Sequence, residues 1–246
     1  MTFALVAAPQ GGAALRYTLM SKPKAWISWS SGKDSAWALQ VMRRQNDLEI
    51  AGLLTTLNGA HHRVAMHAVR ESLLEQQAAS AGLPLIKVFL PWPCSNEAYE
   101  RAMGEAMARA RDEGVTHMVF GDLFLGDVRR YREEKLAACG VIPVFPIWGL
   151  DTTVLAREMV GRGLEAFVTC VDPKRLDASF AGRAFDAGFL QAIPPGVDPC
   201  GENGEFHTFC CAGPMFSRPI AVGPGDVVER DGFWFADLLP RNFACA

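Results

Sequence analysis

The segment WSSGKDSAW, residues 29–37, places small, polar and charged residues between two apolar runs. Residues 25–30, which overlap its start, suit a buried strand. Residues 34–45, which include its end, carry apolar side chains at helical spacing. Small residues let a ligand approach the backbone, a lysine favours negative charge, and a helix start offers free N–H groups. The segment therefore predicts a phosphate-binding turn between a strand and a helix.

The same alternation of strand and helix continues along the chain. Strands are predicted at residues 25–30, 50–57, 85–90, 115–120, 141–147 and 167–171, and helices at residues 34–45, 67–81, 95–113, 129–138 and 154–162. This order predicts an α/β fold with an open, mostly parallel sheet covered by helices on both faces. Ligands bind such sheets at the carboxyl ends of the strands, so residues 30–35, 55–58 and 121–122 are expected to line one crevice.

The pattern changes after Asp172. A short helix is predicted at residues 186–191, proline and glycine then crowd together, and residues 227–235 predict a hairpin that turns at Asp231-Gly232. We expect a smaller C-terminal α+β domain. The predicted boundaries are an N-terminal extension at residues 1–22, a sheet domain at 23–149 and a C-terminal domain at 150–246.

The amino-acid composition limits which classes of partner the protein is expected to have. The 246 residues are 50% hydrophobic with a formal net charge of −3, so no general basic field for nucleic acid is expected. Seven cysteines without C-x-x-C spacing are typical of reduced cytosolic thiols. No apolar run is long enough to span a membrane. We expect a soluble, cytoplasmic protein without a nucleic-acid or membrane partner.

Two common phosphate-binding motifs do not match the 30–35 segment. A Walker A loop needs Ser or Thr where Asp34 stands and Gly where Ile27 stands, and no G-x-G-x-x-G occurs there. The sequence S-S-G-K-D-S instead resembles the PP-loop, S-G-G-x-D-S, of the ATP pyrophosphatases. Those enzymes cleave ATP between the α and β phosphates and transfer AMP. Ser31 replaces the first glycine, which is acceptable if its φ stays negative.

The roles of the loop residues follow from their chemistry. Backbone N–H groups around Gly32 would hold pyrophosphate, Ser30 and Ser35 would donate hydrogen bonds, and Lys33 would neutralise developing charge. A carboxylate beside phosphate suggests that Asp34 is a magnesium ligand. The alternative is an ordinary capped helix start with an exposed lysine. Thr55 and Thr56 would contact the nucleoside, or are ordinary strand residues.

Two further polar clusters stand out. Gly121-Asp122 ends a strand and precedes a helix in which Arg130 and Glu133 are one turn apart and suited to pair, unless that helix is simply solvated. The stretch DPCGENGEFHTF, residues 198–209, crowds functional side chains between glycines, and its alternation puts Glu205, His207 and Phe209 on one face. Its alternative is a surface turn. The histidines His61, His62 and His67 indicate a solvated loop and a histidine at a helix start rather than a metal site.

Together these motifs resemble the diphthine–ammonia ligase family of PP-loop ATPases. The resemblance covers residues 24–220 and includes Pro146-Ile147-Trp148 after a strand. It implies an adenine-nucleotide α-hydrolase domain at 23–149, a substrate-binding domain at 150–246, and diphthamide formation on elongation factor 2 from diphthine, ammonia and ATP. The family's last motif reads E-G-G-E-F-E-T, whereas residues 202–208 read ENGEFHT. The catalytic class therefore carries over better than the substrate.

The resemblance and the chemistry above assign candidate roles. The implied reaction is an AMP-forming amide ligation with ATP and Mg²⁺, in which ammonia attacks an adenylated carboxylate, and a homodimer is expected. The alternatives are a PP-loop enzyme that modifies tRNA, which would favour a basic surface and a cysteine pair, and a nucleotide-binding module without turnover. Candidate catalytic residues are Lys33, Asp122, Glu205 and His207; nucleotide-binding residues are Ser30, Ser31, Gly32, Lys33, Asp34, Ser35, Thr55, Thr56 and Gly121; substrate-binding residues are Arg130, Glu133, Glu202, Asn203, Gly204, Glu205, His207 and Thr208; the metal ligand is Asp34.

Overall fold

The fold was analysed in a computed structural model, which describes residues 21–64 and 67–241. Most of the predicted 1–22 extension therefore lies outside the described residues. The elements are β1 (Lys24–Ser28), α1 (Lys33–Gln45), β2 (Glu49–Asn58), β3 (Arg63–Val64), α2 (Glu71–Ala81), β4 (Leu85–Leu90), α3 (Asn96–Asp112), β5 (Val115–Val119), α4 (Gly126–Ala137), β6 (Ile142–Val144), α5 (Thr152–Gly161), β7 (Glu165–Val171), the 3₁₀ turn η1 (Ala178–Phe180), α6 (Ala187–Ala192), β8 (Phe206–Ala212), β9 (Val222–Arg230) and β10 (Phe233–Pro240).

The larger sheet contains five parallel strands in the order β4-β2-β1-β5-β6, with the short β3 antiparallel to the end of β2. Its chain runs outward from β1 through β2 to β4 and then resumes on the other side of β1 with β5. The strand order thus reverses between β1 and β5. Ligands of open α/β sheets bind outside the carboxyl ends of the strands at such a reversal.

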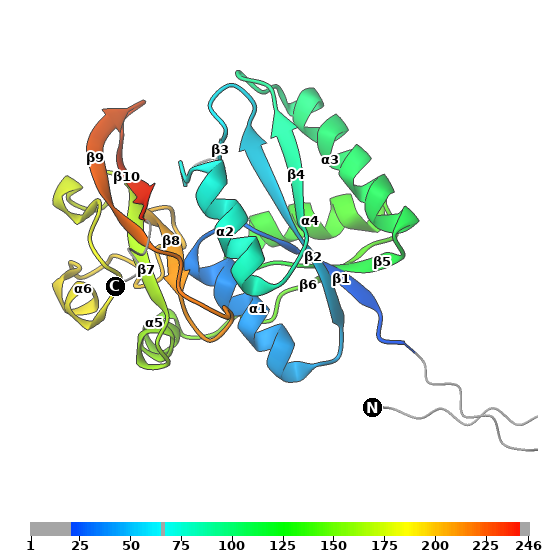
Figure 1. The fold of residues 1–246 in the computed structure, drawn as a ribbon, viewed down its shortest axis with the longest axis horizontal. Coiled ribbons are helices and arrows are strands. Elements are labelled where there is room, and N and C mark those ends of the chain that lie inside the picture. The colour runs from blue at the N-terminus through cyan, green and yellow to red at the C-terminus, as the bar shows by residue number, and fades with distance from the viewer. Residues whose placement is uncertain (1–20, 65–66, 242–246) are drawn as a thin grey trace, which may run out of the picture.

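Side chains on the two faces of this sheet belong to separate cores, because successive strand residues point to opposite faces. Ile27, Leu53 and Val119 belong to the larger cluster of buried residues, and Trp26, Leu54 and Met118 to the smaller one. Figure 1 shows α1 and α2 between the two sheets, and α3 and α4 on the far side of the larger sheet. Helices on both faces confirm the predicted α/β fold.

The C-terminal part forms an antiparallel sheet in the order β8-β7-β10-β9, accompanied by α5 and α6. Its hairpin turns where the sequence predicts. Asp231 and Gly232 both have positive φ, 52° and 81°, as a type I′ turn requires. Phe185, Phe189 and Phe206 are buried together against this sheet. The smaller α+β unit is therefore confirmed.

The boundaries of several helices and strands differ from the predicted ones. The helix predicted from residue 67 begins at Glu71, because residues 63 and 70 form a β-bridge and His67 bonds to the second sheet. The helix predicted from residue 129 begins at Gly126, and the strand predicted at 141–147 is confined to β6. None of the helices in the described part of the chain is both long enough and apolar enough to cross a bilayer.

Candidate functional site

The loop between β1 and α1 is held by the second sheet. The backbone oxygen of Ser31 accepts hydrogen bonds from Cys210 N at 3.0 Å and from Gln77 Nε2 at 2.9 Å. Ser31 is buried and has a φ of 69°, so the condition that its φ stays negative is not met. Its peptide is turned toward these two donors, and a left-handed conformation costs a non-glycine residue about 1–2 kcal/mol.

Two glycines allow close approaches around this loop. A Cβ at Gly32 would lie 2.8 Å from His67 Cε1 and 3.2 Å from the oxygen of Thr208. A Cβ at Gly121 would lie 2.7–2.9 Å from backbone atoms of Asp34 and Ser35. The end of β5 therefore rests directly on the start of α1, and the structure brings residues 121–122 beside residues 30–35, as the sequence predicts.

Lys33 is almost wholly buried and points into the C-terminal domain. Its Nζ lies 2.8 Å from Asp34 Oδ2, donates to the carbonyl of Cys200, and lies 5.5 and 5.3 Å from the ring centres of Phe185 and Phe206. Burial by itself lowers the pKa of Lys33, but the combined attraction of Asp34, Cys200 and Glu202 outweighs burial, so the pKa lies above its usual value. The alternative of an exposed lysine is wrong.

Two carboxylates, Asp34 from the first domain and Glu202 from the second, lie near this lysine. Asp34 Oδ1 is buried without a hydrogen-bond partner among the described residues. Glu202 Oε1 accepts from Leu123 N at 2.7 Å and Phe124 N at 3.4 Å, which joins the 198–209 loop to the end of β5. Burial, aided by the charges of Asp34 and Asp122, raises the pKa of Glu202 to about 7 despite the Leu123 hydrogen bond.

Asp122 pairs with an arginine that sequence reasoning passed over. Arg132 Nε lies 2.9 Å from Asp122 Oδ2, and its guanidinium lies 4.3 Å from the ring centre of Phe120. Burial raises the pKa of Asp122 although Arg132 opposes that shift. The approximately helical spacing of the arginines gave no indication of which one turns inward.

The predicted pairing of Arg130 with Glu133 is wrong. Arg130 pairs with Asp127 at 3.0 Å, and both side chains are exposed. Glu133 pairs instead with Arg129 at 2.7 Å, four residues away, a spacing that places the two groups in reach on a helix. Arg129 also lies over the rings of Phe145 and Trp148. The structure therefore leaves Arg130 outside the cluster of Asp34, Asp122 and Glu202.

The 198–209 loop is built around its own acidic residue rather than lying as a surface turn. Glu205 is 2% exposed, and its Oε1 accepts from Asp198 N and from Asn203 Nδ2, both at 3.1 Å. Thr208 Oγ1 accepts from the backbone N–H of Lys33 at 3.1 Å, so the loop is fastened to the start of α1. Glu205 thus shapes the loop, and Gly204, with a φ of 86°, permits its turn.

His67 and His207 form a half-buried pair beside the loop. Their ring centres are 4.7 Å apart, and His67 Nδ1 donates to the backbone oxygen of Thr208 at 2.9 Å. Burial lowers the pKa of His67 to about 4 and that of His207 to about 3, so both are uncharged at neutral pH. The prediction that His67 starts a helix is wrong, because α2 begins at Glu71. The sequence did not reveal the contact of His67 with Thr208, because the two residues are far apart in the chain.

A cavity of about 560 Å³ opens at the carboxyl ends of β1, β2 and β5. Thr56 lines it, whereas Thr55 is buried and donates to the backbone oxygen of Trp29 at 2.7 Å. Apolar side chains form most of its wall. Of the three segments expected to line one crevice, Ser30 and Thr56 contribute to this lining and residues 121–122 do not. The residues that line it include Ser30, Thr56, His67, Met103, Met107, Met118, Phe120, Arg132 and His207.

This cavity fits an adenine nucleotide by its chemistry. Its methionine and phenylalanine side chains suit a flat apolar base, and hydroxyl and N–H groups at the loop suit phosphate. No group of three or more His, Cys, Asp or Glu side chains within the described residues has the arrangement of a metal site. Mg²⁺ commonly uses one or two carboxylates together with phosphate oxygens, and the unpartnered Asp34 Oδ1 fits such a shared site.

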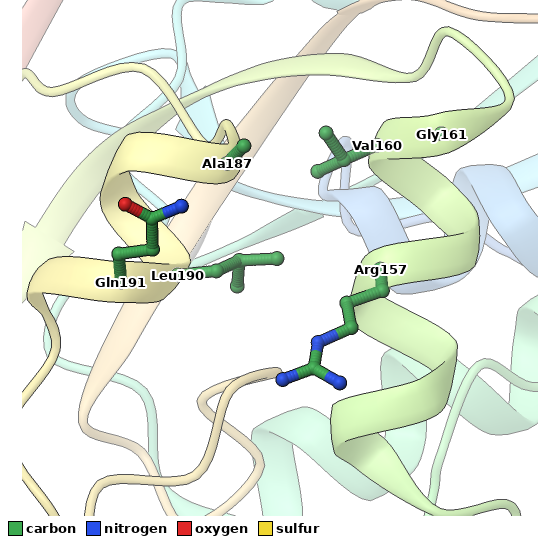
Figure 2. A pocket seen from close by; sticks show the side chains of 6 residues that line it. All are labelled: Arg157, Val160, Gly161, Ala187, Leu190 and Gln191. Carbon is green, nitrogen blue, oxygen red and sulfur yellow. The ribbon is translucent and has the colours of Figure 1, made fainter.

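A second cavity, of about 330 Å³, lies between α5 and α6. Figure 2 shows Val160 and Arg157 of α5 facing Leu190 of α6 across it. None of the sequence-predicted site residues lines this cavity. The candidate site is therefore the cavity at the larger sheet.

Comparison with known proteins agrees with the motifs and the fold. Residues 23–141 match the diphthamide synthase N-terminal domain, and residues 151–239 match the diphthamide synthase C-terminal domain. The chain belongs to the diphthamide synthase family. Both motif-bearing loops of this family member fall inside the matched ranges.

Relatives of this diphthamide synthase family member are named diphthine–ammonia ligase. The Homo sapiens protein is 24% identical over 189 residues, which cover 74% of this chain and 70% of the relative. The Bos taurus protein is 28% identical over 125 residues, covering 48% and 47%, and the Danio rerio protein is 29% identical over 123 residues, covering 46% and 47%.

Proposed function

We propose that this protein is an ATP-dependent amide ligase that adenylates a carboxylate and transfers the acyl group to ammonia. The observation that carries the proposal is the cavity at the strand-order reversal, with the 30–35 loop at its edge and Asp34, Asp122 and Glu202 gathered beside that loop. The names of the relatives support ammonia and diphthine as the reacting partners.

The N-terminal domain, residues 23–149, would bind the nucleotide. Backbone N–H groups at Gly32 and in the first turn of α1 after Lys33, with the Ser30 and Ser35 hydroxyls, would hold the phosphates. The apolar wall around Met118 and Phe120 would enclose the base. Asp34 would share Mg²⁺ with phosphate oxygens, and that ion would supply charge neutralisation during phosphoryl transfer.

The chemistry then needs two displacements. A carboxylate oxygen of the acceptor attacks the α-phosphorus, and the bond to pyrophosphate breaks. Ammonia attacks the resulting acyl carbon, AMP leaves with the electron pair of its bond, and one proton is released. The protein contributes alignment, charge stabilisation and exclusion of water from the acyl-adenylate. The C-terminal domain, residues 150–246, would hold the acceptor beside the nucleotide.

Glu202 is the best candidate to accept that proton. Its hydrogen bonds fall on Oε1, which leaves Oε2 without a hydrogen-bond partner among the described residues. A general base works best when its pKa lies near the working pH, and the pKa of Glu202 is about 7. Glu205 is engaged inside its loop, and a pKa of about 3 makes His207 a weak base.

Product analysis tests this function. We expect incubation with ATP, ammonia and elongation factor 2 carrying diphthine to give AMP and pyrophosphate in equal amounts, together with an amide on the acceptor. A panel of small carboxylates run in parallel would reveal a different acceptor by the same AMP release. Formation of ADP and phosphate would show cleavage at the wrong bond and would rule out adenylation. Reactions without ammonia serve as the control for uncoupled hydrolysis.

A further inference from the structure

Lys33 starts helix α1 of the first domain, yet its charged end lies inside the second. Its Nζ is surrounded by the Cys200 carbonyl and by the ring faces of Phe185 and Phe206, all three from the C-terminal domain. The first domain supplies Asp34, at 2.8 Å. The side chain thus crosses from one domain to the other, and it is not among the residues that line the nucleotide cavity.

A buried ammonium group is costly unless its surroundings replace water. Here a carboxylate, a carbonyl oxygen and two aromatic faces do so, and each of these partners attracts a cation. Contacting a phosphate in the cavity would require Lys33 to give up the Cys200 carbonyl and both rings. The observed contacts therefore favour a Lys33 ammonium group that stays in this position when a nucleotide binds.

Three other contacts join the 198–209 loop and strand β8, which continues from it, to the first domain. Thr208 Oγ1 accepts from Lys33 N, Cys210 N donates to the oxygen of Ser31, and Glu202 Oε1 accepts from Leu123 N. Lys33 lies among these contacts and is the cation that pairs with Asp34, next to Glu202, in the described part of the chain. Without that charge the carboxylates would repel one another across the domain boundary.

We propose that Lys33 is a positioning residue that fastens the 198–209 loop to the 30–35 loop, and that it is not a ligand of the nucleotide phosphates. It holds Glu202 beside Asp34 and Asp122 and so completes a site shared by the two domains. This inference rests on the proposed function only for its effect on turnover. Its structural part can be tested on the protein alone.

The test compares Lys33→Met with Lys174→Met, which removes an exposed lysine of the C-terminal domain. Hydrogen exchange of the 198–209 amides in the ligand-free protein reports how firmly the loop is held. We expect faster exchange there in Lys33→Met and no change in Lys174→Met. Exchange of that loop at the wild-type rate in Lys33→Met would overturn the proposal, whether or not the protein turns over ATP.

Nucleotide affinity distinguishes a positioning role of Lys33 from a role as a phosphate ligand. Calorimetric titration with an ATP analogue that has a methylene group between the α and β phosphates should give Lys33→Met an affinity within about threefold of wild type, while turnover falls about 100-fold. Removal of a phosphate ligand would instead weaken binding by about 10- to 100-fold, and that result with unchanged loop exchange would contradict the proposal.

Phe206→Leu provides a second variant if Lys33→Met does not fold. It keeps both Lys33 and Asp34 and removes one aromatic face from the ammonium group. We expect the same pattern on a smaller scale, with faster loop exchange, lower turnover and unchanged affinity for the analogue. Restoration of turnover by Lys33→Arg, which keeps the charge, would support a positioning role. Loop exchange at the wild-type rate in Phe206→Leu would count against the cation–aromatic contact.

Discussion

Replacing Gly121 with alanine should lower both stability and turnover sharply. The new Cβ would lie 2.7–2.9 Å from backbone atoms of Asp34 and Ser35, and backbone cannot swing aside as a side chain can. Relief of this clash would move the end of β5 away from the start of α1. We expect a loss of about 1–3 kcal/mol in the free energy of unfolding and about 100-fold in turnover, because small displacements misalign the reacting groups.

Denaturant unfolding and AMP release measure these two effects. Gly161→Ala is the matched control, because a Cβ at Gly161 in α5 meets nothing within 4 Å and the position lies outside the candidate site. Alanine there should be neutral or slightly stabilising. If Gly121→Ala unfolds and turns over as Gly161→Ala does, the two loops do not need their close approach and the described site is wrong.

Glu202→Gln should remove the acid limb of the pH–rate profile. The raised pKa means that Glu202 is protonated below about pH 7 and able to accept a proton only above it. Wild-type turnover should therefore fall about tenfold for each pH unit below that value. The glutamine variant should be about 10²- to 10⁴-fold slower and lack this limb, because its amide keeps the contact with Leu123 N without acting as a base.

O-methylhydroxylamine in place of ammonia keeps this experiment interpretable. The pKa of its conjugate acid lies well below that of Glu202, so over the pH range just below 7 protonation of the nucleophile does not imitate the titration of Glu202. Glu133→Gln, on an exposed pair of α4, provides the same chemical change away from the cluster. A wild-type profile that stays flat across pH 7, or a Glu202→Gln profile that keeps the limb, would exclude Glu202 as the base.

The same pKa has a consequence for stability that needs no substrate. A carboxyl group whose pKa is higher in the folded protein binds more protons there than in the unfolded chain. Its contribution therefore favours folding below its usual pKa of 4.5 and is lost as pH rises through about 7. Relative to Glu202→Gln, wild type should lose stability over this range, and thermal unfolding at several pH values measures the difference.

Local pattern was enough to predict the architecture. Helical and strand periodicities indicated which segments alternate, and the rule that ligands bind at carboxyl strand ends placed residues 30–35 and 121–122 together. The Asp231-Gly232 turn was evident because its two residues tolerate positive φ. Ser95 caps α3 through the same kind of local chemistry, since its Oγ accepts from Ala98 N at 3.2 Å.

The features of the site that the sequence did not predict depend on contacts between segments far apart in the chain. Lys33 looked like a phosphate ligand because its neighbours are small, but the rings that receive it lie more than 150 positions away. His67 enters the site because Thr208 holds it, and Arg132 rather than Arg130 turns inward because Asp122 is buried beside it. The φ of Ser31 depends on Cys210 and Gln77 in the same way.

The central claim is that the cavity at β1, β2 and β5 binds an adenine nucleotide. Thr56→Phe tests it by placing a ring where Thr56 lines a cavity of about 560 Å³. Thr116→Phe, on the exposed start of β5, is the control. In calorimetric titrations with the methylene analogue, we expect wild type and Thr116→Phe to bind equally and Thr56→Phe to lose about 100-fold in affinity. Undiminished binding by a folded Thr56→Phe protein, or no binding by wild type, would contradict the account.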